Sequence, residues 1–146
     1  MRIVMMESCH VPQVAALEKL CFSDPWSENS VASELKNELS CWLVALDGDT
    51  VAGYVGSQTV LGETDMMNLA VSPEYRRKGI AKALVNALVE RLKQRESHCL
   101  TLEVRLSNEP ARTLYESLGF VQIGRRPAYY HNPKEDGLIL RKEWEI

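Results

Sequence analysis

The sequence predicts an α/β (α+β) fold with a single mixed, mostly antiparallel sheet flanked by helices. Short apolar runs typical of strands recur along the chain, and amphipathic segments with helical periodicity lie between them. Turn residues separate these segments without an internal repeat or a linker, so we expect one domain over residues 1–146. The 146 residues, of which 45% are hydrophobic and 25% charged, suit a domain with its own core.

The first forty residues indicate a strand and two helices. Residues 1–6 alternate weakly, as a strand does, and Pro12 opens a helical pattern. The segment Asp24-Pro25-Trp26-Ser27 ends that helix, and Ser27 is placed to cap the next one. We expect the inner faces to hold Val14, Leu17, Leu20 and Cys21 in the first helix and Val31, Leu35 and Leu39 in the second.

A hairpin and one further strand follow in the pattern. Asp47-Gly48-Asp49 is a strong signal for a tight turn between two apolar runs. Gly53 and Gly56 lie inside the returning strand, which indicates a bulge or a close backbone approach. Ser72-Pro73 ends the third strand. The expected strands cover residues 41–46, 50–60 and 66–71.

The second half indicates a helix, a strand, a helix and two strands. A basic turn runs into a long amphipathic helix, and the next strand turns Glu103 and Arg105 away from its apolar face. Asn108 is placed to cap the last helix and Gly119 to end it. The long helix is expected to bury Ile80, Ala83, Leu84, Ala87, Leu88 and Leu92, and the strand over 98–106 to bury Leu100, Leu102, Val104 and Leu106. We expect the final strands at 120–123 and 138–140, joined by a loop over 125–137.

Charge and cysteine content narrow the functional class. The net charge of −3 and the pI of about 5.7 argue against a nucleic-acid-binding protein. The pairs Cys9-His10 and His98-Cys99 lack further clustered ligands in the sequence, so we expect no metal and mostly buried, reduced thiols. No run approaches the ~18 apolar residues of a membrane span, and residues 1–10 lack a signal-peptide pattern. We therefore expect a cytoplasmic protein that does not bind a membrane.

The segment 66–82 carries the strongest chemical signal. A strand ends, a basic loop turns at Gly79, and a helix begins, whose unpaired N–H groups can bind phosphate. Gly79 lets the backbone approach a ligand, while Arg76, Arg77 and Lys78 add positive charge. The pattern is neither a Walker loop nor G-x-G-x-x-G. It fits a pyrophosphate site, and a solvated basic turn before a surface helix has the same spacing.

Three segments resemble motifs of the GNAT superfamily of N-acetyltransferases. Arg76 to Ala81 is similar to (Q/R)-x-x-G-x-(G/A), Asn68 to Pro73 to N-x-x-V-x-P, and Asn108 to Phe120 to N-x-x-A-x-x-L-Y-x-x-x-G-F. The resemblance covers essentially the whole chain and implies an acetyl-CoA-dependent enzyme with the GNAT fold. The residues implied to bind acetyl-CoA are Leu69, Ala70, Val71, Arg76, Arg77, Lys78, Gly79, Ile80, Ala81, Lys82 and Asn108.

The resemblance also implies catalytic roles. Glu103 would take the proton of the acceptor amine, directly or through water, and Tyr115 would protonate the leaving thiolate. The N–H groups of Leu69 to Val71 would polarise the thioester carbonyl. Both side chains also fit purely structural roles, because Glu103 could pair with Arg105 or a lysine and Tyr115 could complete an apolar helix face.

Within the superfamily, the chain is most similar to the RimI family of ribosomal-protein-alanine N-acetyltransferases. Asp24 to Ser27 resembles its F-P-W-S loop, Leu102 to Arg105 its L-E-V-R strand, and Tyr129-Tyr130 a tyrosine pair in its late loop. This implies that the acceptor is a basic ribosomal protein, small-subunit protein eighteen, and that its N-terminal alanine is acetylated. Trp26 and Tyr130 are then candidates for the wall of the peptide site, although ordinary packing also accounts for them. Pro127-Ala128 departs from that family and bears on the peptide preference.

Two other functions fit parts of the pattern. A GNAT enzyme for another amine, such as a lysine side chain, a polyamine or an antibiotic, would share the fold and the cofactor residues. An inactive CoA-binding partner module would be expected to lack a base or an acid, and both Glu103 and Tyr115 are present. The acceptor loops 22–30 and 124–135 favour a peptide N-terminus.

Overall fold

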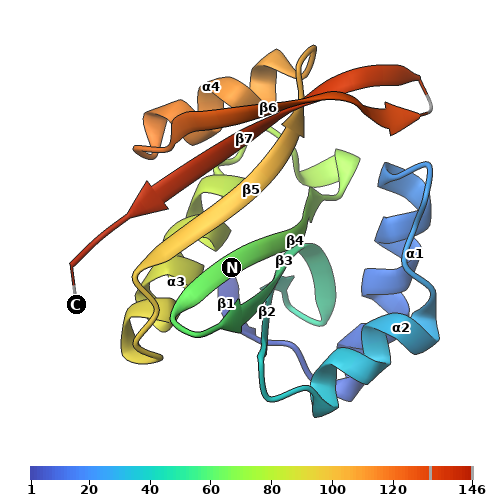
Figure 1. Ribbon diagram of the computed structural model, residues 1–146. Helices are drawn as coiled ribbons and strands as arrows, with labels where there is room; N and C mark the ends of the chain where they lie inside the picture. Colours follow the sequence, from blue (N-terminus) through green and yellow to red (C-terminus); the bar gives the residue numbers. More distant parts are fainter. Residues whose placement is uncertain (132, 146) are drawn as a thin grey trace.

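A seven-stranded sheet forms the centre of the computed structural model, which describes residues 1–131 and 133–145 (Figure 1). The strands lie in the order β1-β2-β3-β4-β5-β7-β6, and every neighbouring pair is antiparallel except β4 and β5. The predicted α/β class with a mixed, mostly antiparallel sheet is confirmed. The strands are β1 (Arg2–Met5), β2 (Ser40–Asp47), β3 (Thr50–Val60), β4 (Glu63–Val71), β5 (Cys99–Arg105), β6 (Val121–His131) and β7 (Lys134–Glu143).

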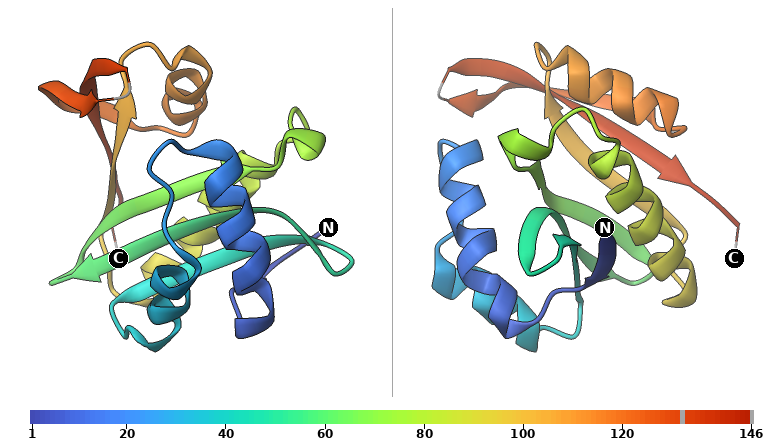
Figure 2. Two further views of the ribbon diagram at one scale, coloured as in Figure 1. Left: turned by 90° about the vertical axis from the view of Figure 1, so that its right-hand side faces the viewer. Right: turned by 180° about the vertical axis from the view of Figure 1, so that it is seen from behind.

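Helices cover both faces of the sheet (Figure 2). One apolar cluster joins α1 and α2 to β2, β3 and β4, and a second joins α3 and α4 to β2, β5 and β7. None of the helices in the described part of the chain has the length and apolarity that a membrane crossing requires. The helices are α1 (Val11–Cys21), α2 (Glu28–Ser33), α3 (Ile80–Gln94) and α4 (Glu109–Ser117), with short 3₁₀ turns η1 (Ser8–His10), η2 (Glu34–Lys36) and η3 (Pro73–Tyr75).

The parallel pair β4 and β5 is joined over a short length only. The partners are Glu63 to Asp65 on β4 and Cys99 to Thr101 on β5. Beyond this seam the two strands diverge, so the ends of both face an opening in the sheet (Figure 1). Met67 lies in a bulge opposite the step from Gly56 to Ser57, just past the seam. Because a bulge bends its strand and raises its twist, it accompanies the turn of β4 away from β5.

The indole of Trp42 fixes the strand next to this bulge. It lies against Gly56, where a Cβ atom would collide with the ring, so a larger residue is not accommodated there. The same indole stacks on Tyr54 with ring centroids 6.0 Å apart and meets Trp26 edge to face at 5.3 Å. Of the two alternatives predicted for this strand, the close approach is found at Gly56, and a bulge of β3 itself is found at Ala52, beside Gly53.

A buried carboxylate ties α1 to two strands. The side chain of Glu18 is fully buried and accepts hydrogen bonds from the backbone N–H of Trp26 (2.9 Å), the Asn68 amide (2.9 and 3.0 Å) and the Tyr54 hydroxyl. Burial and this hydrogen bond raise the pKa of Tyr54. Buried polar groups are costly unless they are paired, so these three partners are what allow a carboxylate here.

The helix faces differ from the sequence prediction at several positions. Leu20, Leu35 and Leu39 are exposed rather than internal, with exposed fractions of 64%, 39% and 49%. Glu18 takes an inner position of α1, and α2 ends at Ser33 before Leu35 can follow its face. In α3, Ala83 is exposed, while Val85 and Val89 are buried with Leu84, Leu88 and Leu92.

The loop expected over 125–137 is instead most of a long hairpin. Strands β6 and β7 pair from Val121–Arg141 to His131–Lys134, with irregular register in between. The sequence prediction is wrong because β6 lies at the sheet edge and is largely exposed, so it has no alternating apolar pattern. Charged pairs such as Arg125–Asp136 (2.6 Å) link the two strands instead. Strand β4 also begins at Glu63 rather than at residue 66.

We predict that Glu18→Ala lowers the free energy of unfolding by about 2–4 kcal/mol. The change leaves the half-buried Asn68 amide and the buried Tyr54 hydroxyl without their acceptor and opens a cavity under Trp26. Urea unfolding of both proteins measures the difference, with the exposed Glu38→Ala as a control that stays within about 0.5 kcal/mol of wild type. A loss below about 1 kcal/mol for Glu18→Ala would show that these bonds contribute little.

Candidate active site

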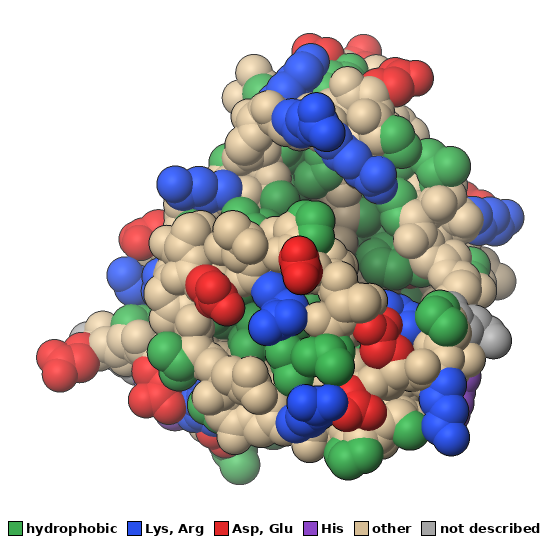
Figure 3. Space-filling view, turned by 90° about the horizontal axis from the view of Figure 1, so that it is seen from above, with side chains coloured by type: hydrophobic (Ala, Val, Ile, Leu, Met, Phe, Trp, Pro, Cys, Tyr) green, Lys and Arg blue, Asp and Glu red, His purple; other side chains and the backbone are tan. Residues whose placement is uncertain are grey.

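The opening between β4 and β5 brings together chemical groups from both halves of the sheet. Figure 3 looks onto this end of the molecule, where the surface is hollowed and hydrophobic side chains lie inside the hollow. On one side lies the free end of β4, and on the other lie β5, α4 and the β6–β7 hairpin (Figure 1). The backbone groups of the β4 end have no β5 partner past Asp65, so they are available to a ligand.

Tyr115 reaches across this opening from α4. Its side chain is only 6% exposed, it packs edge to face on Phe120 (5.4 Å), and its hydroxyl lies 3.8 Å from the sulfur of Met66 on β4. Burial raises the pKa of Tyr115, and the neighbouring Tyr130 contributes in the same direction. The phenol is therefore neutral at physiological pH and lies beside the β4 bulge.

Glu103 lies on β5 with its side chain 25% exposed and is not free. The guanidinium Nε of Arg126 on β6 lies 2.9 Å from Glu103 Oε1. A hydrogen bond to Glu103 raises the pKa of Tyr129. The sequence prediction offered Arg105 or a lysine as a pairing partner, and the partner is Arg126 because the late segment is a strand beside β7 rather than a loop.

Tyr130 on β6 interacts electrostatically with both Glu103 and Tyr115. Its ring carries the guanidinium of Arg105 at 4.4 Å, and burial and the charge of Glu103 raise its pKa to about 12. The structure thus brings three of the predicted site residues, Glu103, Tyr115 and Tyr130, to one side of the opening. Asp65, which the sequence did not single out, is the last β4 residue of the seam, and burial and then the charge of Glu103 raise its pKa.

The N-terminus of α3 is open to a ligand. The first backbone bond of the helix runs from Ala83 to the carbonyl of Gly79, so the N–H groups of Ile80, Ala81 and Lys82 precede the helical pattern. Gly79 has a φ of +75°, offers no side-chain cap, and has open space where a Cβ would lie. An uncapped helix start with free space around it is a good anion site.

The basic side chains of this loop are exposed, and two of them contact the protein. Arg76 donates from Nε to the carbonyl of Val71 (3.2 Å), and Lys78 lies over the ring of Tyr75 at 5.3 Å. Arg77 has a positive φ of 66°. The loop therefore folds back on the end of β4, where the predicted residues Leu69 and Val71 are half-buried and Ala70 is buried between them.

Asn108 and Trp26 both have structural partners. Asn108 caps α4 as predicted, with Oδ1 accepting from Ala111 N–H at 3.2 Å. Trp26 packs against Trp42 in the cluster under α1 and α2, and its backbone is held by Glu18. Ordinary packing therefore accounts for the buried side of Trp26, which keeps a partly exposed side as well.

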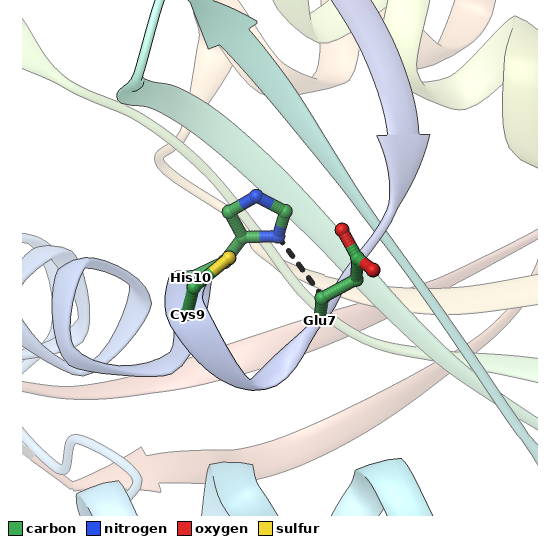
Figure 4. Close-up of side chains that lie close together, drawn as sticks. All are labelled: Glu7, Cys9 and His10. Atoms are coloured by element: carbon green, nitrogen blue, oxygen red, sulfur yellow. Dashed lines mark hydrogen bonds between the residues drawn. The ribbon is translucent and has the colours of Figure 1, made fainter.

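Two groups of potential metal ligands occur among the described residues. The sequence showed two Cys-His neighbours, and the fold adds one carboxylate to each: Glu7 with Cys9 and His10, and Glu63 with His98 and Cys99. In the first group, His10 Nδ1 already accepts the backbone N–H of Glu7 at 3.0 Å, and the two residues cap η1 (Figure 4). That lone pair has a structural role, so this arrangement is a helix start rather than a prepared coordination site.

All four cysteines are free thiols. Cys41 and Cys99 are buried, Cys21 is intermediate and Cys9 is exposed, so only half of them fit the expectation of buried thiols. Burial raises the pKa of Cys41, which keeps that thiol protonated and unreactive.

Comparisons with known proteins identify the family. The model of the acetyltransferase (GNAT) family matches residues 11–120. The chain is 35% identical over 140 residues to the ribosomal protein bS18-alanine N-acetyltransferase of Escherichia coli, which covers 94% of each chain. It is 33% identical over 141 residues to the protein of the same name from Haemophilus influenzae, covering 94% of this chain and 95% of the relative.

Solved structures share the fold over nearly the full length. The crystal structure of the E. coli ribosomal-protein-S18-alanine N-acetyltransferase superposes with a TM-score of 0.91 at 33% identity, covering 99% of this chain and 94% of the other. Arabidopsis thaliana NAA60 in complex with acetyl-CoA superposes with a TM-score of 0.87, covering 97% of each chain. The identity to NAA60 is 18%, so that similarity concerns the fold alone.

We predict that Tyr115→Phe makes stability less sensitive to alkaline pH. An unfolded tyrosine ionises near pH ~10, whereas the folded Tyr115 stays protonated above that value, so stability is present below pH ~10 and is lost as pH rises further. Urea unfolding at pH 9 and pH 11 should show a loss that is smaller in the variant by about 1 kcal/mol. An equal loss in both proteins would mean that Tyr115 ionises normally in the folded state.

Proposed function

We propose that this chain, which belongs to the acetyltransferase (GNAT) family, transfers the acetyl group of acetyl-CoA to the α-amino group of a protein, with the N-terminal alanine of ribosomal protein bS18 as its acceptor. The observation that carries the proposal is the placement of a proton donor, Tyr115, and a carboxylate, Glu103, at one opening beside the free end of β4. The choice of acceptor rests on the relatives at 33–35% identity, which are named bS18-alanine N-acetyltransferases. We place the reaction in the cytoplasm, within one domain.

The chain offers a continuous surface for acetyl-CoA. The free N–H groups of Ile80, Ala81 and Lys82 would bind the pyrophosphate, and the positive charges of Arg77 and Lys78 would add to this field. Leu69 to Val71 pair with β3 but have no β5 partner, and this open edge of β4 would receive the pantetheine arm and orient the thioester carbonyl. Asn108 would lie beside the cofactor while capping α4.

Proton transfer would use the two residues that face the opening. An α-amine has a pKa of ~7.7–8.0 against ~10.4 for a lysine, so deprotonation at pH 7 costs roughly 1 kcal/mol for the former and about 4.6 kcal/mol for the latter. A carboxylate such as Glu103, acting directly or through water, is therefore a sufficient base for an N-terminal amine. Tyr115, whose phenol is protonated at pH 7, would give its proton to the departing thiolate.

The acceptor peptide would enter between the α1–α2 segment and the β6–β7 hairpin. Trp26 would form one wall through its exposed side and Tyr130 the other. The Pro127-Ala128 step lies in the register irregularity of β6 between Arg126 and Tyr130, and Ala128 has a φ of +51°. This local shape sets the position of both hairpin tyrosines and hence the peptide preference.

We predict that the protein adds one acetyl group to a basic peptide that begins with alanine and none to the same peptide with a blocked N-terminus and internal lysines. Mass spectrometry with acetyl-CoA and purified protein measures this. Tyr115→Phe and Glu103→Gln should each lower kcat by a factor of about 10² or more, the range of general acid–base catalysis.

Each other outcome indicates a different function. Acetylation of the blocked peptide would point to lysine side chains as acceptors. Binding of acetyl-CoA without transfer to either peptide would contradict the peptide assignment and leave small amines or an inactive CoA-binding module. Full activity in Tyr115→Phe would remove that residue from the proton path.

We also predict that Gly79→Asp raises the dissociation constant of CoA about tenfold or more, because the new carboxylate would cap the free N–H groups and repel the pyrophosphate. Gly48→Asp is a matched control, since Gly48 also has a positive φ (60°) and open space at its Cβ position. Calorimetry with CoA compares both variants with wild type. Equal affinity in all three proteins would move the phosphate site away from α3.

A further inference from the structure

The carboxylate proposed as the base is already engaged by a cation of the protein itself. Arg126 Nε lies 2.9 Å from Glu103 Oε1, with side chains 55% and 25% exposed. Tyr129 hydrogen-bonds the same carboxylate. A carboxylate has about four acceptor positions, so these two partners take half of them before any acceptor arrives.

The backbone around Arg126 is fixed by β7. The β6 strand carries extra residues between Arg126 and Tyr130, and the carboxylate of Asp136 holds this bulge by accepting from Ala128 N–H (2.8 Å) and from Arg125 Nε (2.6 Å). Bulges of this kind re-aim side chains at functional sites. Arg126 is therefore presented to Glu103 by a braced segment.

The side chain of Arg126 can leave Glu103 without any movement of the hairpin backbone. Arg105 fastens the hairpin through the carbonyl of Pro133 (2.8 Å) and the carboxylate of Glu135 (3.3 Å), so the hairpin itself is anchored to β5. The guanidinium of Arg126 also lies 5.4 Å from the centre of the Tyr129 ring and is half exposed, which provides a second favourable environment. The Arg126 guanidinium can therefore leave Glu103 without losing all favourable contacts for its positive charge.

We infer that Arg126 is a specificity-determining residue. Its guanidinium occupies the place beside Glu103 that the α-ammonium group of the acceptor takes, and an acceptor binds by displacing the guanidinium. The inference rests on the proposed function and explains how the acceptor site selects a free N-terminus. At pH 7 an α-amine is mostly ammonium, so it can replace one cation by another at Glu103. A neutral, blocked N-terminus cannot make this exchange and leaves the ion pair closed.

The test compares Arg126→Gln with wild type under steady-state conditions, using the alanine-terminated peptide and saturating acetyl-CoA. Removing the competitor should lower KM for the peptide about two- to fivefold, the range that an ion pair of this exposure supports, and leave the dissociation constant of CoA unchanged. Arg126→Lys keeps a cation and should lie near wild type. Lys134→Gln removes one exposed charge from β7 of the same hairpin, leaves the Asp136 brace intact and should also leave KM unchanged.

Because KM equals the dissociation constant only when chemistry is slow, calorimetry of peptide binding to the CoA-loaded proteins gives the same comparison without turnover. A higher KM and weaker binding in Arg126→Gln would overturn the inference and make Arg126 a contact of the acceptor. Unchanged values would overturn it too, since the ion pair would then not compete. The proposed function is judged separately by transfer to the peptide in wild type, whatever the ratio between the variants.

Discussion

The short seam between β4 and β5 is the constraint on which the molecule depends. Three residues of each strand pair, and beyond them the Met67 bulge beside Gly56 accompanies the separation of the strands. Unpaired backbone inside a sheet is costly when it is closed off from water and partners, so such an opening is kept only where something can fill it. The candidate site residues of both halves, from Tyr115 on α4 to the start of α3, are arranged around that opening.

Each side of the opening is braced by a different kind of interaction. On the β4 side, the buried Glu18 carboxylate hydrogen-bonds to the α1–α2 segment, β3 and β4, and Trp42 stacks on Tyr54, one of its partners. On the β5 side, charged pairs at the surface, with Arg105 and Asp136 at their centre, hold the edge hairpin in place. The Glu18 hydrogen bonds are buried in the core and insensitive to salt, whereas the ion pairs of the hairpin are partly exposed and are screened by salt.

The sequence predicts those elements whose residue pattern reflects their own burial or capping. Apolar runs on either side of a tight-turn signal located β2 and β3, apolar alternation located β5, and cap chemistry located the start of α4, because burial, turns and capping are local properties. The hairpin β6–β7 was missed, since its pairing depends on partners rather than on an apolar face, and for the same reason Glu18 and Arg126 gave no signal. Motif resemblance supplied the family and the candidate residues, while the partners of Glu103 required the three-dimensional arrangement.

The uncapped start of α3 has a consequence for the life of the protein. The helices α2 and α4 begin with a serine and an asparagine that satisfy their first amides, and α3 begins with a glycine that does not. Stability that a cap would contribute, typically about 1 kcal/mol, is left to be supplied by an anion from outside. Folding and occupancy are thereby linked: the fraction of chains that unfold, and with it exposure to proteases, falls as the bound anion becomes more abundant.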